Sequence, residues 1–404
     1  MSQLKLKIAA VSSQRQLDSI SQTFYAPADY KVYFTQDVFS ISNPILKDEI
    51  CTNSKKLNSV ICFVDSEVLN HHPQLPEKIK NYIEQDSAMQ LVTPPISVQG
   101  GEACKNDPEL LQKFYKIILD FGVDRHSSIL AIGGGAVLDL IGYVAATAHR
   151  GIRLLRLPTT VLSQNDSGVG VKNGINFLDR KNFLGTFAPP DAVICDFDFL
   201  SSLSERDKRA GMAEAIKVSL IRDADFFDWH ETNLDALNNF EFEPVAYSIK
   251  LSAQIHARQI SSGGDPFEKG SARPLDYGHW LAHKLEVMSG YEVKHGEAVA
   301  IGMLVDARYS YEIGLLSEYS FNRIKHLIEG LRFLLWHPAL KNKNACNDLV
   351  VLEGIEEFRE HLGGELSITL LKEIGTGVEV HKIDLDIMRS CLNWLKGLKC
   401  EKIR

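Results

Sequence analysis

Three consecutive glycines between a buried strand and a helix constrain the fold of this chain more than any other feature. The strand is expected over residues 128–132, it leads into Gly133, Gly134 and Gly135, and the helix continues to about residue 148. Continuous apolar runs are typical of parallel strands buried on both faces. Glycines at such a turn let backbone N–H groups approach a pyrophosphate, although tight turns need glycine in any case. The pattern predicts a parallel α/β domain with a candidate dinucleotide site, although it is not the G-x-G-x-x-G fingerprint.

Further apolar runs predict neighbouring strands of the same sheet. They cover residues 31–34, 60–65, 154–157 and 192–196, and a helix is expected over residues 108–121. The second run ends in Asp65, and an acidic residue there either contacts a ribose or caps the following helix. Residues 164–182 lack helix and strand cues, so we expect a polar loop that suits either a phosphate site or a solvated surface.

The apolar period changes to 3.6 residues after Ser204, which predicts a helical second half. Helices are expected over residues 205–221, 226–237, 244–261, 275–289, 297–313, 321–334, 353–362 and 383–397, with a strand-like exception at 366–371. The sequence therefore predicts two domains, an α/β domain over residues 1–200 and a helical domain over residues 201–404.

The helical half contains the residue types of a metal site. His279 and His283 are four residues apart, which places them on one helix face, and His295 follows them. With the carboxylate of Glu214, two or three imidazoles form the ligand set of a catalytic zinc-type site. Which histidines are ligands stays open here, and a single histidine on an apolar helix is often structural. A zinc protease needs Glu directly after the first His, and Trp280 excludes that class.

Composition limits the classes of function. Of the 404 residues, 45% are hydrophobic and 24% are charged, as in ordinary globular proteins. The net charge of −8 argues against a broad nucleic-acid or anionic-membrane surface. Seven scattered cysteines without a C-x-x-C pair indicate reduced thiols, and the chain shows neither a signal pattern nor an apolar run of transmembrane length. We expect a cytoplasmic protein with a small-molecule substrate and neither nucleic acid nor membrane as partner.

These segments together resemble the sugar phosphate cyclases, the superfamily of 3-dehydroquinate synthase. The resemblance covers roughly residues 60–380 and rests on Gly101-Glu102-x-x-Lys105, Gly133-Gly134-Gly135-x-x-x-Asp139, Pro158-Thr159-Thr160, Asp166-Ser167-x-x-Gly170-x-Lys172, Lys181-Asn182, Ala213-Glu214-x-x-Lys217, Gly278-His279 and His295-Gly296. It implies a Rossmann-like α/β domain that binds NAD, a mainly α-helical domain that binds one zinc or cobalt ion, and an active site between them. It also implies a homodimer.

The resemblance implies a role for each matching residue. The metal ligands become Glu214, His279 and His295. The NAD site becomes Asp65, Glu102, Lys105, Gly134, Gly135, Ala136, Asp139, Thr159 and Thr160. The catalytic and substrate-binding residues become Asp166, Lys172, Lys181, Asn182, Lys217, Arg273, Asp276, His283 and His361.

The chemistry of the family explains this set of residues. In these carbon–oxygen lyases, NAD transiently oxidises a secondary alcohol of a sugar phosphate, and the metal polarises its oxygen as a Lewis acid. The resulting ketone acidifies the neighbouring C–H, so that phosphate leaves by β-elimination. The hydride then returns, the ring opens, and an intramolecular aldol addition closes a carbocycle. The net redox change is zero, and the protein mainly binds and orients.

The substrate is indicated by departures from the dehydroquinate synthase pattern. Those enzymes usually show Arg-x-Leu-Leu-Asn-x-Gly-His-Thr-x-Gly-His, whereas this chain places Asp276 at the Asn position. Two unit charges about 4 Å apart at an effective dielectric of about 20 interact by about 4 kcal/mol, so Asp276 disfavours a substrate carboxylate. The pattern around Asp276, with Glu-Phe-Arg-Glu-His-Leu-Gly-Gly at 357–364, is similar to 2-epi-5-epi-valiolone synthases, which act on sedoheptulose 7-phosphate. An insertion at 261–270 shifts the match to the family, so whether Arg258 or Arg273 replaces a family basic residue stays open, as does another epimer as product.

Three alternatives stay open alongside this interpretation. One is 3-dehydroquinate synthase itself. Another is an iron-type metal-dependent alcohol dehydrogenase, which would release NADH and would not need Lys172, Lys181 and Asn182 to bind phosphate. The third is a non-catalytic binding protein, against which the complete set of metal-binding residues argues.

Overall fold

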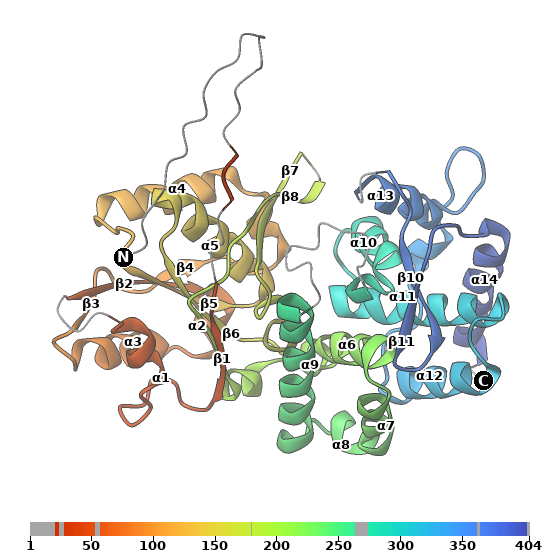
Figure 1. Cartoon of the computed structure of the whole chain (residues 1–404), viewed down its shortest axis with the longest axis horizontal. Helices are drawn as coiled ribbons and strands as arrows, with labels where there is room; N and C mark the ends of the chain where they lie inside the picture. Colours follow the sequence, from red (N-terminus) through yellow and green to blue (C-terminus); the bar gives the residue numbers. More distant parts are fainter. Residues whose placement is uncertain are drawn as a thin grey trace, which may run out of the picture.

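The computed structural model describes residues 21–23, 28–52, 57–178, 180–262, 274–361 and 364–401. An α/β part, red to yellow in Figure 1, lies beside a helical part coloured green to blue. Arg273 lies outside the described residues, as does the side chain of His361. No helix in these described ranges is long and apolar enough to cross a membrane.

A parallel sheet of seven strands forms the centre of the α/β part. Its order is β1 (Lys31–Thr35), β9 (Ala192–Asp196), β6 (Arg153–Pro158), β5 (Ser128–Gly133), β2 (Asn58–Asp65) and β3 (Met89–Leu91), and β4 (Ile96–Val98) also pairs with β2. Every pairing is parallel. The predicted parallel sheet and its central strands are therefore confirmed.

Helices cover both faces of this sheet, which explains why its strands are apolar throughout. They are α1 (Ile45–Ile50), α2 (Ser66–His71), α3 (Leu75–Glu84), α4 (Pro108–Asp120) and α5 (Gly135–Thr147). Along β2, Val60 and Cys62 pack on the face of α1 and α3, whereas Ile61 and Phe63 pack on the face of α4 and α5. Successive residues point to opposite faces of a strand, so both sets must be apolar.

The helical part is built around two helices that are buried on nearly all sides, α6 (Glu205–Arg222) and α11 (His295–Glu312). Around them lie α7 (Ala224–Thr232), α8 (Leu234–Asn238), α9 (Phe242–Ser262), α10 (His279–Met288), α12 (Glu318–Gly330), α13 (Glu353–His361) and α14 (Leu385–Glu401), with the hairpin β10 (Ile368–Glu373) and β11 (Thr376–Val380). The predicted order of an α/β part followed by a mainly helical part is confirmed, while the division at residue 200 stays a prediction.

The prediction of a polar loop over residues 164–182 is wrong. The chain forms a π-helical turn at Ser163–Ser167 and then a hairpin of β7 (Lys172–Phe177) and β8 (Arg180–Phe187). Ile175 packs into the core between the sheet and α5, but Asn173 and Asn176 are also buried. Asn173 accepts from Arg156 and Asn176 donates to Glu102, so buried polar pairs replace the apolar alternation that identifies a strand.

Two predicted helices begin or end elsewhere. The helix expected over 226–237 is divided at Asn233 into α7 and α8. The helix expected from residue 275 begins only at His279, because a 3-10 turn at Pro274–Asp276 and Gly278 precede it. Gly278 has φ of 78°, and a Cβ there would lie 2.8 Å from the Met303 nitrogen, so only glycine fits.

A buried carboxylate fixes the start of α10. Asp306 on α11 accepts hydrogen bonds from the Gly278 backbone N–H at 3.1 Å and from Trp280 Nε1 at 2.9 Å. These two donors flank His279. Burial raises the pKa of Asp306 to about 7, although both donors oppose the shift. Asp306 therefore positions the histidine, and its ionisation opposes folding.

We predict that Asp306 makes the stability of the protein depend on pH between about 4 and 7. The folded-state pKa lies above the ordinary value of 3.8, so its stabilising contribution is complete below pH 4 and is lost as pH rises through 7. The loss should reach up to about 4 kcal/mol. Asp306→Asn should remove this part of the pH dependence, measured as the free energy of unfolding in urea with excess chelator. Asp120→Asn, an exposed control, should leave the pH profile unchanged, and an identical profile in Asp306→Asn would refute the prediction.

Candidate active site

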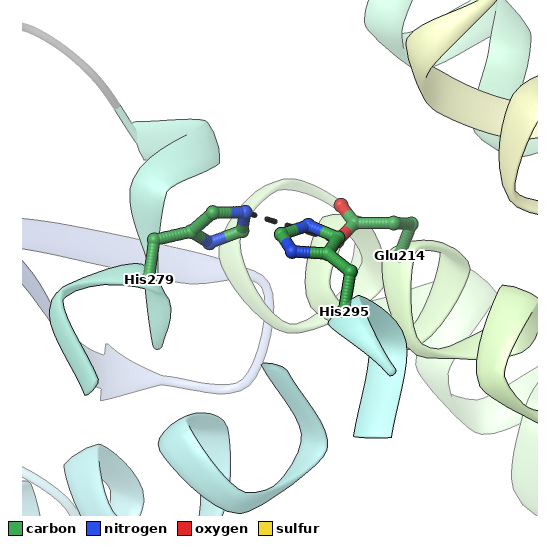
Figure 2. Close-up of side chains that lie close together, drawn as sticks. All are labelled: Glu214, His279 and His295. Carbon is green, nitrogen blue, oxygen red and sulfur yellow. Dashed lines mark ion pairs between the residues drawn. The ribbon is translucent and has the colours of Figure 1, made fainter. Parts of the chain in front are cut away.

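Three side chains predicted as metal ligands converge where α6, α10 and α11 meet. Figure 2 shows Glu214, His279 and His295 pointing toward one another. Glu214 Oε1 lies 3.8 Å from His279 Nε2 and 3.7 Å from His295 Nε2, and one ligand atom from each residue lies within 4.8 Å of the others. Glu214 is completely buried, and its Oε1 has no hydrogen-bond partner in the described part of the chain. A buried carboxylate oxygen without a donor is costly, so this group fits a divalent cation.

Close packing of two helices brings Glu214 and His295 together. A Cβ at Gly296, in the first turn of α11, would lie 1.9 Å from the Ala210 carbonyl oxygen of α6. Glycine at position 296 therefore permits the approach. Beside it, Arg206 of α6 donates to Glu297 of α11 at 2.6 Å, which fixes the same ends of the two helices.

Hydrogen bonds orient both imidazoles so that Nε2 faces Glu214. His279 Nδ1 lies 3.0 Å from the Tyr277 carbonyl oxygen, and His295 Nδ1 lies 3.0 Å from Glu286 Oε2. Both partners can only accept, so each Nδ1 carries the proton and each Nε2 is available to a metal. Burial and nearby Lys217 hold the pKa of His279 well below its usual value. Burial also acts to lower the pKa of His295, but Glu286 outweighs it and raises that pKa.

A second possible metal group shares His295 but fits a cation less well. His283, Glu286 and His295 also have ligand atoms within 4.8 Å of one another. Both oxygens of Glu286 are already engaged, because Oε1 accepts from Lys181 at 2.9 Å and Oε2 faces His295. The Lys181 ammonium would repel a cation there. The geometry therefore favours Glu214, with its open oxygen, over Glu286.

Charged residues predicted as catalytic surround the metal group. The His283 ring lies 5.4 Å from that of His279. Lys217 is buried and in contact with Glu214. Burial acts to lower the pKa of Lys217, but the charges of Glu214, Asp166 and Asp276 raise it. Lys217 is therefore charged, with Asp166 and Asp276 within electrostatic range.

His256 is a site residue that was not predicted from the sequence. His256 lies on helix α9, which packs against the turn Ser163–Ser167 that contains Asp166. Its Nδ1 is 2.7 Å from Asp166 Oδ1. Burial acts to raise the pKa of Asp166, but His256 and Lys217 outweigh it and lower that pKa strongly. The sequence left open whether Arg258 or Arg273 replaces the family basic residue near this segment. The imidazole of His256, two positions before Arg258, is the group that contacts Asp166.

The glycine turn has the shape predicted for a dinucleotide site. Gly134 is the N-cap of α5, and Ala136 follows Gly135 in the first turn. A Cβ at Gly135 would lie 2.6 Å from the Ser167 hydroxyl, which is buried without a hydrogen-bond partner among the described residues. Backbone N–H groups at a helix N-terminus and an unpaired hydroxyl suit a phosphate group. The residues present therefore fit a dinucleotide.

The other predicted NAD-site residues close to this turn also have partners within the chain. Thr160 Oγ1 lies 2.8 Å from Ser163 Oγ, and the Thr159 N–H donates to the Gly133 carbonyl at 3.0 Å. Asp65 accepts from the Glu67 N–H at 2.9 Å and caps α2, as one of the two interpretations predicted. The contact of Asp65 with a ribose stays a prediction.

A second network joins predicted NAD-site residues to a predicted substrate residue. Buried Lys105 lies 2.8 Å from Asp139 and 3.7 Å from Glu102, and it contacts the Asn182 side-chain oxygen. Asn176, which was not predicted, accepts from the Asn182 N–H at 2.8 Å and donates to Glu102 at 3.1 Å. The two predicted sites therefore share one hydrogen-bond network.

A buried arginine shapes the loop that leads to Lys172. The Arg156 guanidinium donates to the carbonyl oxygens of Gly168 at 3.1 Å and Gly170 at 2.7 Å, and to Asn173 Oδ1 at 2.6 Å. These bonds fix the chain between Asp166 and β7. Lys172 itself is exposed at the start of β7.

Comparisons with known proteins identify the family. The model of the 3-dehydroquinate synthase N-terminal region matches residues 95–210, and the model of its C-terminal region matches residues 211–351. The chain is 35% identical over 315 residues to the 3-dehydroquinate synthase of Dictyoglomus turgidum, covering 74% of this chain and 86% of that protein. It is also 35% identical over 350 residues to the 3-dehydroquinate synthase of Caldanaerobacter subterraneus subsp. tengcongensis, covering 85% of this chain and 94% of that protein. The chain belongs to the 3-dehydroquinate synthase family of sugar phosphate cyclases.

Solved structures share this fold. The 2-epi-5-epi-valiolone synthase ValA from Streptomyces hygroscopicus subsp. jinggangensis, with NAD+ and Zn2+ bound, has a TM-score of 0.82 at 25% identity and covers 93% of this chain and 99% of its own. A 2-deoxy-scyllo-inosose synthase with carbaglucose-6-phosphate, NAD+ and Co2+ has a TM-score of 0.72 at 22% identity, and the match covers 89% of this chain and 95% of that chain. A glycerol dehydrogenase from Schizosaccharomyces pombe has a TM-score of 0.63 at 17% identity, and the match covers 91% of this chain and 89% of that chain. This is a likeness of fold alone.

We predict that the protein binds one divalent ion at Glu214, His279 and His295. His279→Ala should lose this ion, because one of the two proposed imidazole ligands is removed. The loss is measured as the metal content per chain after dialysis. His283→Ala is the matched control and should retain the ion, since His283 belongs only to the group with Glu286. Full occupancy in His279→Ala, or loss only in His283→Ala, would contradict the assignment.

Proposed function

We propose that the protein is an NAD- and divalent-metal-dependent cyclase that converts sedoheptulose 7-phosphate to a cyclitol of the 2-epi-5-epi-valiolone type with loss of phosphate. Family membership supports the reaction class. One observation carries the choice of substrate. The carboxylate of Asp276 lies within electrostatic range of the ammonium of Lys217, and Lys217 is buried beside the metal group. NAD and zinc or cobalt are proposed because the residues present fit both groups and related structures contain them.

The geometry supports the following proposed roles. Bound NAD supplies a temporary oxidation of a secondary alcohol, and a metal held by Glu214, His279 and His295 supplies Lewis-acid polarisation of its oxygen. Lys217 is held charged by the carboxylates around it and can donate to a substrate oxygen. Asp166 is held ionised by Lys217 and His256, so its oxygens can accept a hydrogen bond from a substrate hydroxyl.

The proposed phosphate site lies on the hairpin β7–β8. Lys172, Lys181 and Asn182 occur at its two strands, and Lys181 is held toward the metal group by Glu286. Ammonium and amide donors can first hold the phosphate and then stabilise it as it leaves. The remaining substrate roles proposed for His283, His361 and Arg273 rest on the family pattern.

Asp276 supports a neutral substrate end. It follows Leu275 in the turn before α10 and is partly buried. An ionised carboxylate can only accept hydrogen bonds, so it suits a hydroxymethyl group and leaves a substrate carboxylate without a donor. We also propose a cytoplasmic homodimer, which family membership and the scattered cysteines support.

The relatives that are 35% identical favour a second candidate, 3-dehydroquinate synthesis. Their substrate carries a carboxylate at the end that the family Asn faces. The two candidates therefore differ in the charge of one substrate group, and Asp276 is the residue that distinguishes them.

We predict that the protein turns over sedoheptulose 7-phosphate and rejects the seven-carbon phosphate acid used for dehydroquinate. The ratio of kcat/KM values should be about 10⁴ or more, because sites built around buried polar pairs reject mismatched groups strongly. Phosphate release measures the rate, and NMR identifies the product. Asp276→Asn should lose activity on the neutral sugar. Faster turnover of the acid by the unmodified protein would return the chain to dehydroquinate synthesis.

A further prediction concerns the redox balance. NAD should be required for phosphate release but should not be consumed, since its hydride returns to the substrate within each turnover. Absorbance of NADH should therefore stay constant while cyclitol accumulates. NADH formed in proportion to product would instead support the alcohol dehydrogenase alternative.

A further inference from the structure

Glu286 lies between a residue of the candidate metal site and a residue of the candidate phosphate site. Its Oε1 accepts from Lys181 Nζ at 2.9 Å, and its Oε2 accepts from His295 Nδ1 at 3.0 Å. The residue is only 4% exposed. Lys181 belongs to the hairpin strand β8 and His295 begins α11, so this one carboxylate from α10 connects three elements.

Each contact of Glu286 has a distinct consequence. The carboxylate can only accept, so it holds the proton of His295 on Nδ1 and directs Nε2 toward Glu214. At Lys181 it fixes one end of a long, flexible side chain and neutralises part of its charge. Because one carboxylate serves both partners, a change at either partner alters its interaction with the other.

We propose that Glu286 is a positioning residue that couples metal binding to phosphate binding. This inference rests on the proposed function and adds a link between its two sites. An anion that attracts Lys181 weakens the Lys181–Glu286 pair and leaves more negative charge for His295, which strengthens the metal site. By linkage, a metal ion at His295 makes Lys181 more attractive to a phosphate by the same factor.

Two variants separate coupling from a purely structural role. Glu286→Gln is nearly isosteric but removes the charge, so it should weaken metal affinity by about 10-fold to 100-fold, as changes of such supporting groups do. Lys181→Met removes the competitor for Glu286, so it should increase metal affinity. A network that merely maintains packing would weaken metal binding in both variants.

The experiment measures Co2+ affinity of the full chain from its visible absorption in competition with a chelator, without substrate. In the unmodified protein, inorganic phosphate should tighten Co2+ binding, and this effect should be lost in Lys181→Met and reduced in Glu286→Gln. Far-UV circular dichroism verifies folding. If Glu286→Gln does not fold, Glu286→Asp takes its place; because its shorter side chain cannot reach both partners, it should likewise weaken Co2+ binding.

The outcomes distinguish this inference from the function on which it rests. Three results overturn the coupling and leave the cyclase proposal intact: Co2+ affinity in the folded Glu286 variant within about twofold of the unmodified protein, no increase of Co2+ affinity in Lys181→Met, or no effect of phosphate on Co2+ binding by the unmodified protein. An unmodified protein that binds no Co2+ and releases no phosphate from sedoheptulose 7-phosphate overturns the proposed function itself.

Discussion

A buried carboxylate oxygen, Glu214 Oε1, that has no hydrogen-bond donor among the described residues is the constraint on which the site depends. Glu214 Oε1 faces two imidazole Nε2 atoms, at 3.8 and 3.7 Å. Since each Nδ1 donates its proton to its own acceptor, the two Nε2 atoms direct lone pairs toward the carboxylate oxygen of Glu214. Three lone pairs so close together repel one another unless a positive charge lies between them. A proton can join only two of the three atoms, whereas a divalent ion could join all three.

The surrounding fold makes that arrangement possible by bringing backbone segments unusually close. Glycine at position 296 lets α11 touch α6, and glycine at position 278 lets the turn before α10 touch α11. Asp306 then fixes that turn by accepting from both sides of His279. These contacts use backbone atoms and one buried carboxylate, so small errors of helix position would move a ligand by a large fraction of a metal–ligand bond.

Features determined by local chemistry could be predicted from the sequence, and features determined by distant partners could not. The turn at Gly134 and Gly135 was predictable because an apolar run, glycines and a helix follow one another directly. The metal group could be inferred from residue types, although choosing among the histidines required the family resemblance. The contact of Asp166 with His256 spans 90 positions and that of Lys181 with Glu286 spans 105, so no local pattern indicates either pair.

Those two pairs also explain how the α/β part and the helical part meet at the site. Each joins a residue of the α/β part to a helix of the helical part, and each has one member that is buried or nearly so. Separating such a pair leaves a poorly solvated charge, so both pairs favour one alignment of the two parts. Because Asp166 and Lys181 are themselves proposed substrate contacts, aligning the parts and assembling the site become the same event. The proposed reaction, which oxidises, eliminates, reduces and recloses one bound molecule, needs this property, since an intermediate that escaped after the first step would leave the cofactor reduced.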